Sequence, residues 1–284
     1  MADKTGRVPV VRTTTEEGMG GTWSTVPMAH SPTGFANLPY PWQQAKQDAL
    51  KAHQAVKEGL AGDGKAAAET PTLPDLATRF GTESAPARQR HAELYHMLFH
   101  PWRDRPLRML EIRPSAGPEG TNDAATLQLW LEYFPQGRVH ALDTAGLPGL
   151  DHDRLTTHRA DPEDGPAIRA ALKDAGRFDI ILDDASHASH HQQTAFLALF
   201  GALQPGGLYI IEDLRRQPEA QERPGITRTA DLFRSYSETR RFNHVDPATE
   251  AAFQALAPEI SGCLLFQVNF DKRRKDQIAV IQKR

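Results

Sequence analysis

The chain has 284 residues, and its 33 Lys and Arg side chains nearly balance 36 Asp and Glu side chains, which leaves a formal net charge of −3. This balance gives no electrostatic support for nucleic-acid binding. No apolar run approaches the roughly 18 residues that a membrane span needs. A single cysteine, Cys263, excludes an intramolecular disulfide and a cysteine-rich zinc site. Because the polar N-terminus also lacks the apolar core of a signal peptide, we expect a cytoplasmic protein with neither a nucleic-acid nor a membrane partner.

The first part of the chain, residues 1–70, differs in composition from residues 71–284. Residues 1–40 are rich in Thr, Gly, Pro and Ser without a hydrophobic period, which predicts an extended or partly disordered region. Also within residues 1–70, Trp42–Leu60 has apolar residues three or four apart and is predicted as one helix. We interpret this region as a mobile tail, with a lid or a dimer arm as the alternative, so a homo-oligomer stays an open question.

Helices and strands alternate in the second part, in chain order. The expected strands are Leu107–Ile112, Arg138–Asp143, Thr157–Ala160, Phe178–Leu182, Leu208–Ile211, Cys263–Asn269 and Gln277–Ile281, and the expected helices are Leu73–Phe80, His91–Phe99, Ala124–Tyr133, Pro166–Ala175, Gln192–Leu203, Ala230–Tyr236 and Glu250–Leu256. Pro205-Gly206-Gly207 is interpreted as the turn that ends the fifth helix. This alternation predicts an α/β domain with a mainly parallel sheet, and the apolar strands indicate helices on both faces.

Acidic residues end four of the predicted strands, and a parallel sheet would gather them at one edge, where ligands bind in such folds. Asp143 ends the second strand, where an acid commonly accepts hydrogen bonds from ribose hydroxyls. Asp161 follows the third strand, where an acid can meet a base. Each aspartate alone fits a turn or a cap equally well.

Three of these acids, Asp184, Glu212 and Asp213, would repel one another strongly in a desolvated cleft unless a cation joined them. Oxygen ligands favour Mg²⁺, with Ca²⁺ or Mn²⁺ as alternatives, over zinc. His187 lies three residues after Asp184, at the expected start of a helix, where it can act as a general base. The structural alternative is a helix-start histidine beside solvated acids.

Three neighbouring histidines, His187, His190 and His191, raise a second metal hypothesis. His187 and His191 are four residues apart and would share one face of a helix. No HExxH motif accompanies them, so a zinc or iron site is the minor interpretation.

A longer pattern resembles a known family. Its residues are Asp183-Asp184-Ala185-Ser186-His187, His191, Phe196, Leu203, Pro205-Gly206-Gly207 and Ile211-Glu212-Asp213-Leu214, preceded by Arg79-Phe80-Gly81-Thr82, His91, Tyr95, Leu110-Glu111-Ile112, Trp130, Tyr133-Phe134-Pro135 and Asp143. This pattern, from Leu73 to Leu214, resembles the Mg²⁺-dependent sugar O-methyltransferases of macrolide biosynthesis, of the mycinamicin and macrocin type, and the related cephalosporin-hydroxylase-like group.

The resemblance implies a class I methyltransferase (Rossmann-like) fold with an antiparallel final strand, which binds S-adenosylmethionine and Mg²⁺. It implies that a glycosylated or polyhydroxylated small-molecule acceptor binds through its hydroxyls to the metal. The residues that match the family's metal ligands are Asp184, Glu212 and Asp213, the base is His187, and the cofactor residues are Glu111, Asp143 and Asp161.

The sequence departs from the family at the loop after Ile112. The family has a glycine there, whereas this chain has Arg113-Pro114-Ser115-Ala116-Gly117-Pro118-Glu119-Gly120. Glycine lets the backbone approach a cofactor closely, and arginine and proline do not. The alternative function is therefore a non-methylating descendant, which serves as a binding or scaffold protein or catalyses another natural-product tailoring reaction.

Overall fold

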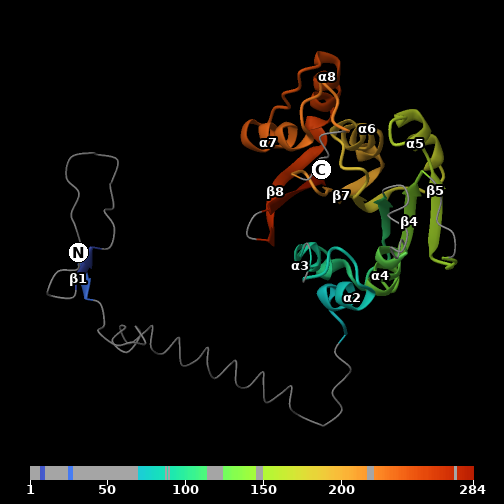
Figure 1. Cartoon of the computed structure of the whole chain (residues 1–284), viewed down its shortest axis with the longest axis horizontal. Coiled ribbons are helices and arrows are strands. Elements are labelled where there is room, and N and C mark those ends of the chain that lie inside the picture. Colours follow the sequence, from blue (N-terminus) through green and yellow to red (C-terminus); the bar gives the residue numbers. More distant parts are fainter. Residues whose placement is uncertain are drawn as a thin grey trace, which may run out of the picture. The chain divides into compact units, whose positions relative to one another are not determined.

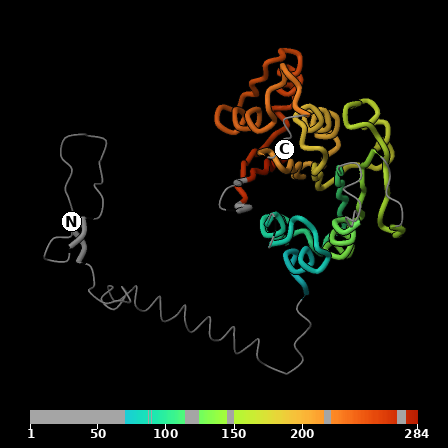
Figure 2. Tube along the Cα trace, viewed as in Figure 1, coloured from blue at the N-terminus to red at the C-terminus, as the bar shows by residue number. Residues whose placement is uncertain are grey.

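The computed structural model describes residues 7–9, 25–27, 70–86, 88, 90–113, 124–144, 150–215, 221–271 and 274–284, and Figure 2 shows most of them in colour. Contacts divide the chain into two units, Met1–Glu69 and Thr70–Arg284. In the first unit, β1 (Arg7–Pro9) pairs antiparallel with β2 (Thr25–Pro27). The helix predicted at Trp42–Leu60 lies outside the described residues.

A seven-stranded sheet forms the centre of the second unit (Figure 1). Its strands are β3 (Arg108–Ile112), β4 (Arg138–Asp143), β5 (Leu155–Arg159), β6 (Phe178–Asp183), β7 (Leu203–Ile211), β8 (Ile260–Asp271) and β9 (Arg274–Lys283). They lie in the order β5-β4-β3-β6-β7-β9-β8. The pairs from β5 to β7 are parallel, and β9 runs antiparallel to both of its neighbours. The expected mainly parallel sheet with an antiparallel final strand is confirmed.

Helices cover both faces of this sheet, as the apolar strands predict. One face carries α2 (Leu73–Phe80), α3 (His91–Phe99) and α4 (Ala125–Tyr133), and the other carries α5 (Gly165–Ala171), α6 (Ser189–Leu199), α7 (Thr229–Thr239) and α8 (Pro247–Leu256). Short 3₁₀ turns follow α3, α6 and α8 at His100–Trp102, Phe200–Ala202 and Ala257–Glu259.

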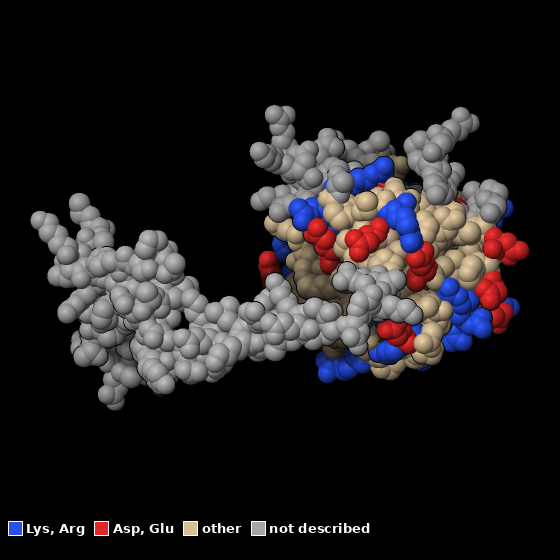
Figure 3. Space-filling view, turned by 90° about the horizontal axis from the view of Figure 1, so that it is seen from below, with Lys and Arg blue, Asp and Glu red and all other residues tan. Residues whose placement is uncertain are grey.

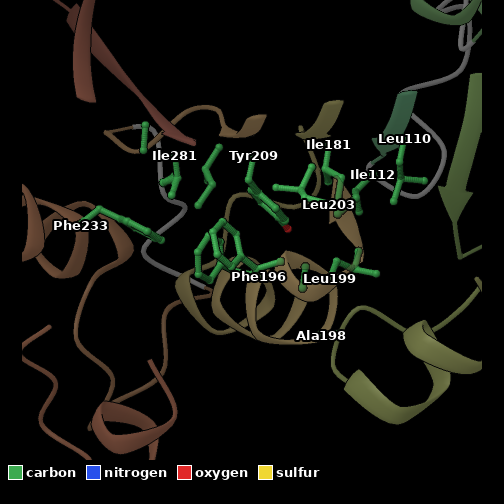
Figure 4. Close-up of a cluster of buried hydrophobic side chains, with 14 of the residues drawn as sticks. Leu110, Ile112, Ile181, Phe196, Ala198, Leu199, Leu203, Tyr209, Phe233 and Ile281 are labelled. Atoms are coloured by element: carbon green, nitrogen blue, oxygen red, sulfur yellow. The ribbon is translucent and has the colours of Figure 1, made fainter. Parts of the chain in front are cut away.

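Each face of the sheet has its own hydrophobic core, because neighbouring residues of a strand point to opposite sides. In β3, Leu110 packs in the core beneath α6, and Met109 packs in the core beneath α3 and α4. Figure 4 shows Phe196 and Leu199 of α6 below the strand residues of the core that α6 covers. The Phe196 ring lies 4.8 Å from the Phe200 ring, between centroids. These two cores hold the strand ends rigidly at one edge.

The Pro205-Gly206-Gly207 segment is not the helix end that the sequence predicts. The helix α6 ends at Leu199, and the segment lies inside β7, where the pairing with β6 shifts in register between Phe178 and Ile180. Gly206 has a φ of +81°, and a Cβ on Gly207 would lie 2.9 Å from the carbonyl oxygen of Gln204. The two glycines therefore form a bulge. In a sequence, a Pro-Gly-Gly segment is typical of a bulge as well as of a turn.

The described surface is mixed in charge on the face that Figure 3 shows. Acidic and basic side chains are interspersed over the face in Figure 3, as the near-zero net charge leads one to expect. Cys263 is buried. Among the described residues, no helix has the length and apolar character to cross a membrane.

A histidine pair between β4 and β5 makes stability depend on pH. His140 Nδ1 lies 2.9 Å from His158 Nε2, and His140 is buried. Burial, followed by the charge of His158, lowers the pKa of His140 from 6.5 to about 4. The unfolded chain thus binds a proton below pH 6.5 that the native state does not bind until near pH 4. The stability that the neutral form provides is complete above this window and is lost as the pH falls through it.

We expect this residue to lower the free energy of unfolding by about 2 kcal/mol between pH 7 and pH 5. Urea unfolding of His140→Gln should therefore show a weaker loss on acidification than the unchanged protein. His100→Gln, at an exposed position, serves as the control and should keep the original slope. Equal slopes for all three proteins would contradict this assignment.

Candidate active site

The carboxyl ends of the parallel strands bring the predicted acids to one edge of the sheet. Asp183, the last residue of β6, pairs with Ile211, the last residue of β7. The pairing continues beyond both strands, because the N–H of Glu212 donates to the Asp183 carbonyl at 3.0 Å. The N–H of Asp184 donates to the Ile112 carbonyl of β3 at 3.0 Å. Residues far apart in the sequence are thereby held side by side.

Asp184, His187 and Asp213 form a compact group, in which one ligand atom of each lies within 4.8 Å of the others. His187 Nε2 is 3.3 Å from Asp213 Oδ2. Both residues have left-handed backbone, with φ of 61° for His187 and 53° for Asp213. Such φ values are uncommon outside glycine and cluster at functional sites. His187 precedes α6 by two residues, so it is a loop residue and not the predicted helix-start residue.

The electrostatics of this group disfavour a full set of ionised carboxylates. Burial, followed by the negative charges of Glu212 and Asp213, raises the pKa of Asp184 well above its usual value. Burial and the adjoining Asp213 raise the pKa of Asp276, on β9, to about 7. A divalent cation would relieve this repulsion, and hard oxygen ligands suit Mg²⁺.

Glu212, the third predicted carboxylate, is turned toward α3. Its Oε2 accepts a hydrogen bond from His91 Nδ1 at 2.9 Å, and its Oε1 accepts one from the Tyr95 hydroxyl. Burial lowers the pKa of His91, but the carboxylates of Glu212, Asp213 and Asp276 outweigh it, and the net pKa is raised. His91 and Tyr95 belong to the family pattern, but no role in the site is predicted for them from the sequence. Their spacing of four residues on a helix was the available signal.

A pocket beside this group lies at the ends of β3 and β4. It is lined by Ile112, Arg113, Leu142, Asp143, Thr144, Ala160, Pro162, Ile168, Ala185, His191 and Ala195. Its largely apolar walls and the single strand-end carboxylate of Asp143 suit a nucleoside.

The other two predicted cofactor residues lie near this pocket without lining it. Asp161 is exposed, and its carboxylate accepts the N–H of Glu163 at 2.9 Å. Glu111 is buried, with Oε1 3.3 Å from Arg113 Nη1. Burial is the main cause that raises the pKa of Glu111. Most of the divergent loop, residues 114–120, lies outside the described residues.

The histidines following His187 belong to a different group. His191 Nε2 and His190 Nε2 lie 3.0 and 3.4 Å from Glu163 Oε1, and Arg223 Nη2 lies 2.5 Å from the same oxygen. The hypothesis that His187 and His191 share a helix face is wrong, because His187 lies before the helix. The guanidinium of Arg223 already compensates the Glu163 charge, which weakens the zinc or iron interpretation.

Comparisons with curated proteins agree with the resemblance, although no protein-family model matches the chain. The chain is 40% identical over 121 residues to the 8-demethyl-8-(2-methoxy-alpha-L-rhamnosyl)-tetracenomycin-C 3'-O-methyltransferase of Streptomyces olivaceus. The match covers 43% of this chain and 31% of that relative. It is 32% identical over 165 residues to the mycinamicin VI 2''-O-methyltransferase of Micromonospora griseorubida, covering 58% of this chain and 41% of the relative. The similarity thus spans less than half the length of either relative.

Solved structures show the fold. The MycE methyltransferase from the mycinamycin biosynthetic pathway, in complex with Mg, SAH and mycinamycin VI, superposes with a TM-score of 0.58 and 24% identity, over 95% of this chain and 68% of that one. The chain has a class I methyltransferase fold. A second crystal form of MycE, with Mg and SAH, gives a TM-score of 0.59 at 23% identity, over 95% and 66% of the two chains.

The raised pKa of Asp184 predicts that its charge destabilises the metal-free protein. Below the ordinary pKa of an aspartate, the Asp184 carboxyl is protonated and the free energy of unfolding is highest. That stability is lost as the pH rises through the raised pKa of the folded state. In EDTA at pH 8, Asp184→Asn should therefore raise the free energy of unfolding by about 1 kcal/mol, and by less at pH 5. Chemical denaturation measures this, with Asp153→Asn, whose side chain is 89% exposed, as the control. A destabilised Asp184→Asn protein at pH 8 would contradict the account.

Proposed function

We propose that this protein is an S-adenosylmethionine- and Mg²⁺-dependent O-methyltransferase that acts on a sugar hydroxyl of a glycosylated secondary metabolite. The convergence of Asp184, His187 and Asp213 beside the pocket at the ends of β3 and β4 carries the proposal. The relatives named above support the reaction class, since both are O-methyltransferases and one name includes a rhamnosyl group.

S-adenosylmethionine would occupy the pocket at the ends of β3 and β4. Asp143, at the end of β4, would accept hydrogen bonds from the ribose hydroxyls. Asp161 would lie near the adenine, since the next residue, Pro162, lines the pocket. Glu111 would lie beside the cofactor loop, and its ion pair with Arg113 compensates its buried charge. Arg113 thus has a structural partner at the position where the family has glycine.

The metal ligands in this proposal are Asp184, Glu212 and Asp213. The carboxylate pair in contact range and the raised pKa of Asp184 fit a divalent ion. Glu212 can still contribute, because each carboxylate oxygen accepts more than one partner. A bound Mg²⁺ supplies Lewis acidity, which lowers the pKa of a neighbouring acceptor hydroxyl.

His187 would then accept the hydroxyl proton. Its side chain is 26% exposed, whereas its partner Asp213 is buried. Asp213 orients the ring through the 3.3 Å contact with Nε2. Histidine ordinarily titrates near neutral pH, which suits a base acting on a hydroxyl already made more acidic. The remaining contribution of the protein is alignment of acceptor and cofactor.

The acceptor would contact residues between Arg215 and His244, which follow the metal-binding turn. This stretch includes Arg223, which is paired with Glu163, and Glu163 also contacts the pocket residue His191. Cytoplasmic location belongs to the same proposal. Size-exclusion chromatography with light scattering tests whether the protein is a monomer or a homo-oligomer, which the sequence leaves open.

Calorimetry with S-adenosylmethionine separates this function from a non-methylating descendant of the fold. The full chain should bind the cofactor with micromolar affinity, and Asp143→Ala should weaken binding at least tenfold, because it removes the ribose partner. Asp174→Ala, on the loop between α5 and β6, serves as the control and should bind like the unchanged protein. Absence of binding at millimolar cofactor would favour the scaffold alternative.

Replacing the proposed base should affect chemistry more than binding. His187→Ala should lower kcat by about 10²- to 10⁴-fold while the dissociation constant for S-adenosylmethionine changes little. The assay is methyl transfer to a panel of glycosylated polyketides, followed by mass spectrometry. Unchanged turnover would remove His187 from the mechanism, and His100→Ala, at an exposed position, controls for a general effect of losing a histidine.

A further inference from the structure

Two residues of α3 hold both oxygens of the Glu212 carboxylate, and neither belongs to the ligand group proposed above. His91 Nδ1 donates to Oε2 at 2.9 Å, and the Tyr95 hydroxyl donates to Oε1. The two residues are four apart on the same helix, so one helix face presents both donors. They reach Glu212 across 121 and 117 residues of sequence.

These contacts are shielded from water. His91 is 0% exposed, Tyr95 is 1% exposed and Glu212 is 4% exposed. The Tyr95 ring stacks on Phe99, with centroids 5.6 Å apart, and lies 6.0 Å from the Trp130 ring. The helix α3 is therefore a rigid support for the carboxylate.

The opposite side of His91 faces β9. Its Nε2 has no hydrogen-bond partner and lies 3.8 Å from Oδ2 of Asp276. Asp276 Oδ1 in turn accepts from the N–H of Arg215 at 3.4 Å, and the Gln277 carbonyl accepts from the N–H of Leu214 at 3.0 Å. Thus α3 holds the Glu212 side chain, and β9 holds the backbone that follows Asp213, at Leu214 and Arg215.

We propose that His91 and Tyr95 are positioning residues, which set the direction of the Glu212 carboxylate so that its remaining lone pairs face the metal position. The inference rests on the proposed function, because Glu212 is a ligand only if the site binds Mg²⁺. Groups that orient a metal ligand commonly contribute 10- to 100-fold to metal affinity. Neither His91 nor Tyr95 lines the pocket at the ends of β3 and β4, so cofactor binding there should not depend on them.

The first test removes a single hydroxyl. Tyr95→Phe should weaken Mg²⁺ binding about 10-fold or more in calorimetry with the full chain, and leave the S-adenosylmethionine dissociation constant within about twofold. Tyr133→Phe is the matched control, because the Tyr133 hydroxyl is near His96 Nδ1, at 3.0 Å, and contacts no carboxylate of the site. Tyr133→Phe should bind Mg²⁺ like the unchanged protein. Unchanged or tighter Mg²⁺ binding by Tyr95→Phe would overturn the proposal.

The second test separates the two nitrogens of His91. His91→Asn retains a donor near the Nδ1 position and should keep Mg²⁺ affinity within about threefold, whereas His91→Leu should lose about 10- to 100-fold. Thermal unfolding in EDTA identifies a variant that fails to fold, in which case Tyr95→Phe decides. If the unchanged protein binds no Mg²⁺, the proposed function fails. If it binds Mg²⁺ and Tyr95→Phe binds equally well, only the positioning role fails, whatever the result for His91→Leu.

Discussion

Repulsion between buried and half-buried carboxylates at one edge of the sheet is the constraint on which the site depends. Asp184, Glu212 and Asp213 follow adjacent parallel strands, and Asp276 reaches the same place from β9. Charges this close are costly in a desolvated setting unless they are protonated or compensated. The raised pKa values of Asp184 and Asp276 express that cost. A cation at this position would convert the repulsion into binding energy.

The backbone around these groups is as constrained as the side chains. His187 and Asp213 both adopt left-handed φ, which costs free energy at non-glycine residues. Parallel pairing between β6 and β7 and the contact of Leu214 with β9 hold the two turns on either side of the site. The hydrophobic cores on the two faces of the sheet supply the stability that offsets this cost in free energy.

The local parts of this arrangement could be predicted from the sequence, and the long-range parts could not. Strand-end acids at Asp184, Glu212 and Asp213 follow from apolar runs that end in carboxylates, and a parallel sheet necessarily aligns such ends. The contact of His91 with Glu212 crosses 121 residues, and no periodicity encodes it. The bulge at Gly206 was also not predicted, because turn residues indicate a bend without specifying whether it ends a helix or lies inside a strand.

A direct view of a bound ion would test the central claim that the carboxylate edge is a divalent-cation site. Crystals of the full chain grown with Mn²⁺ would provide an anomalous difference map. The account predicts one strong peak within coordination distance of the Asp184 and Asp213 carboxylates. A peak only at Glu163, His190 and His191, or no peak at saturating Mn²⁺, would contradict it.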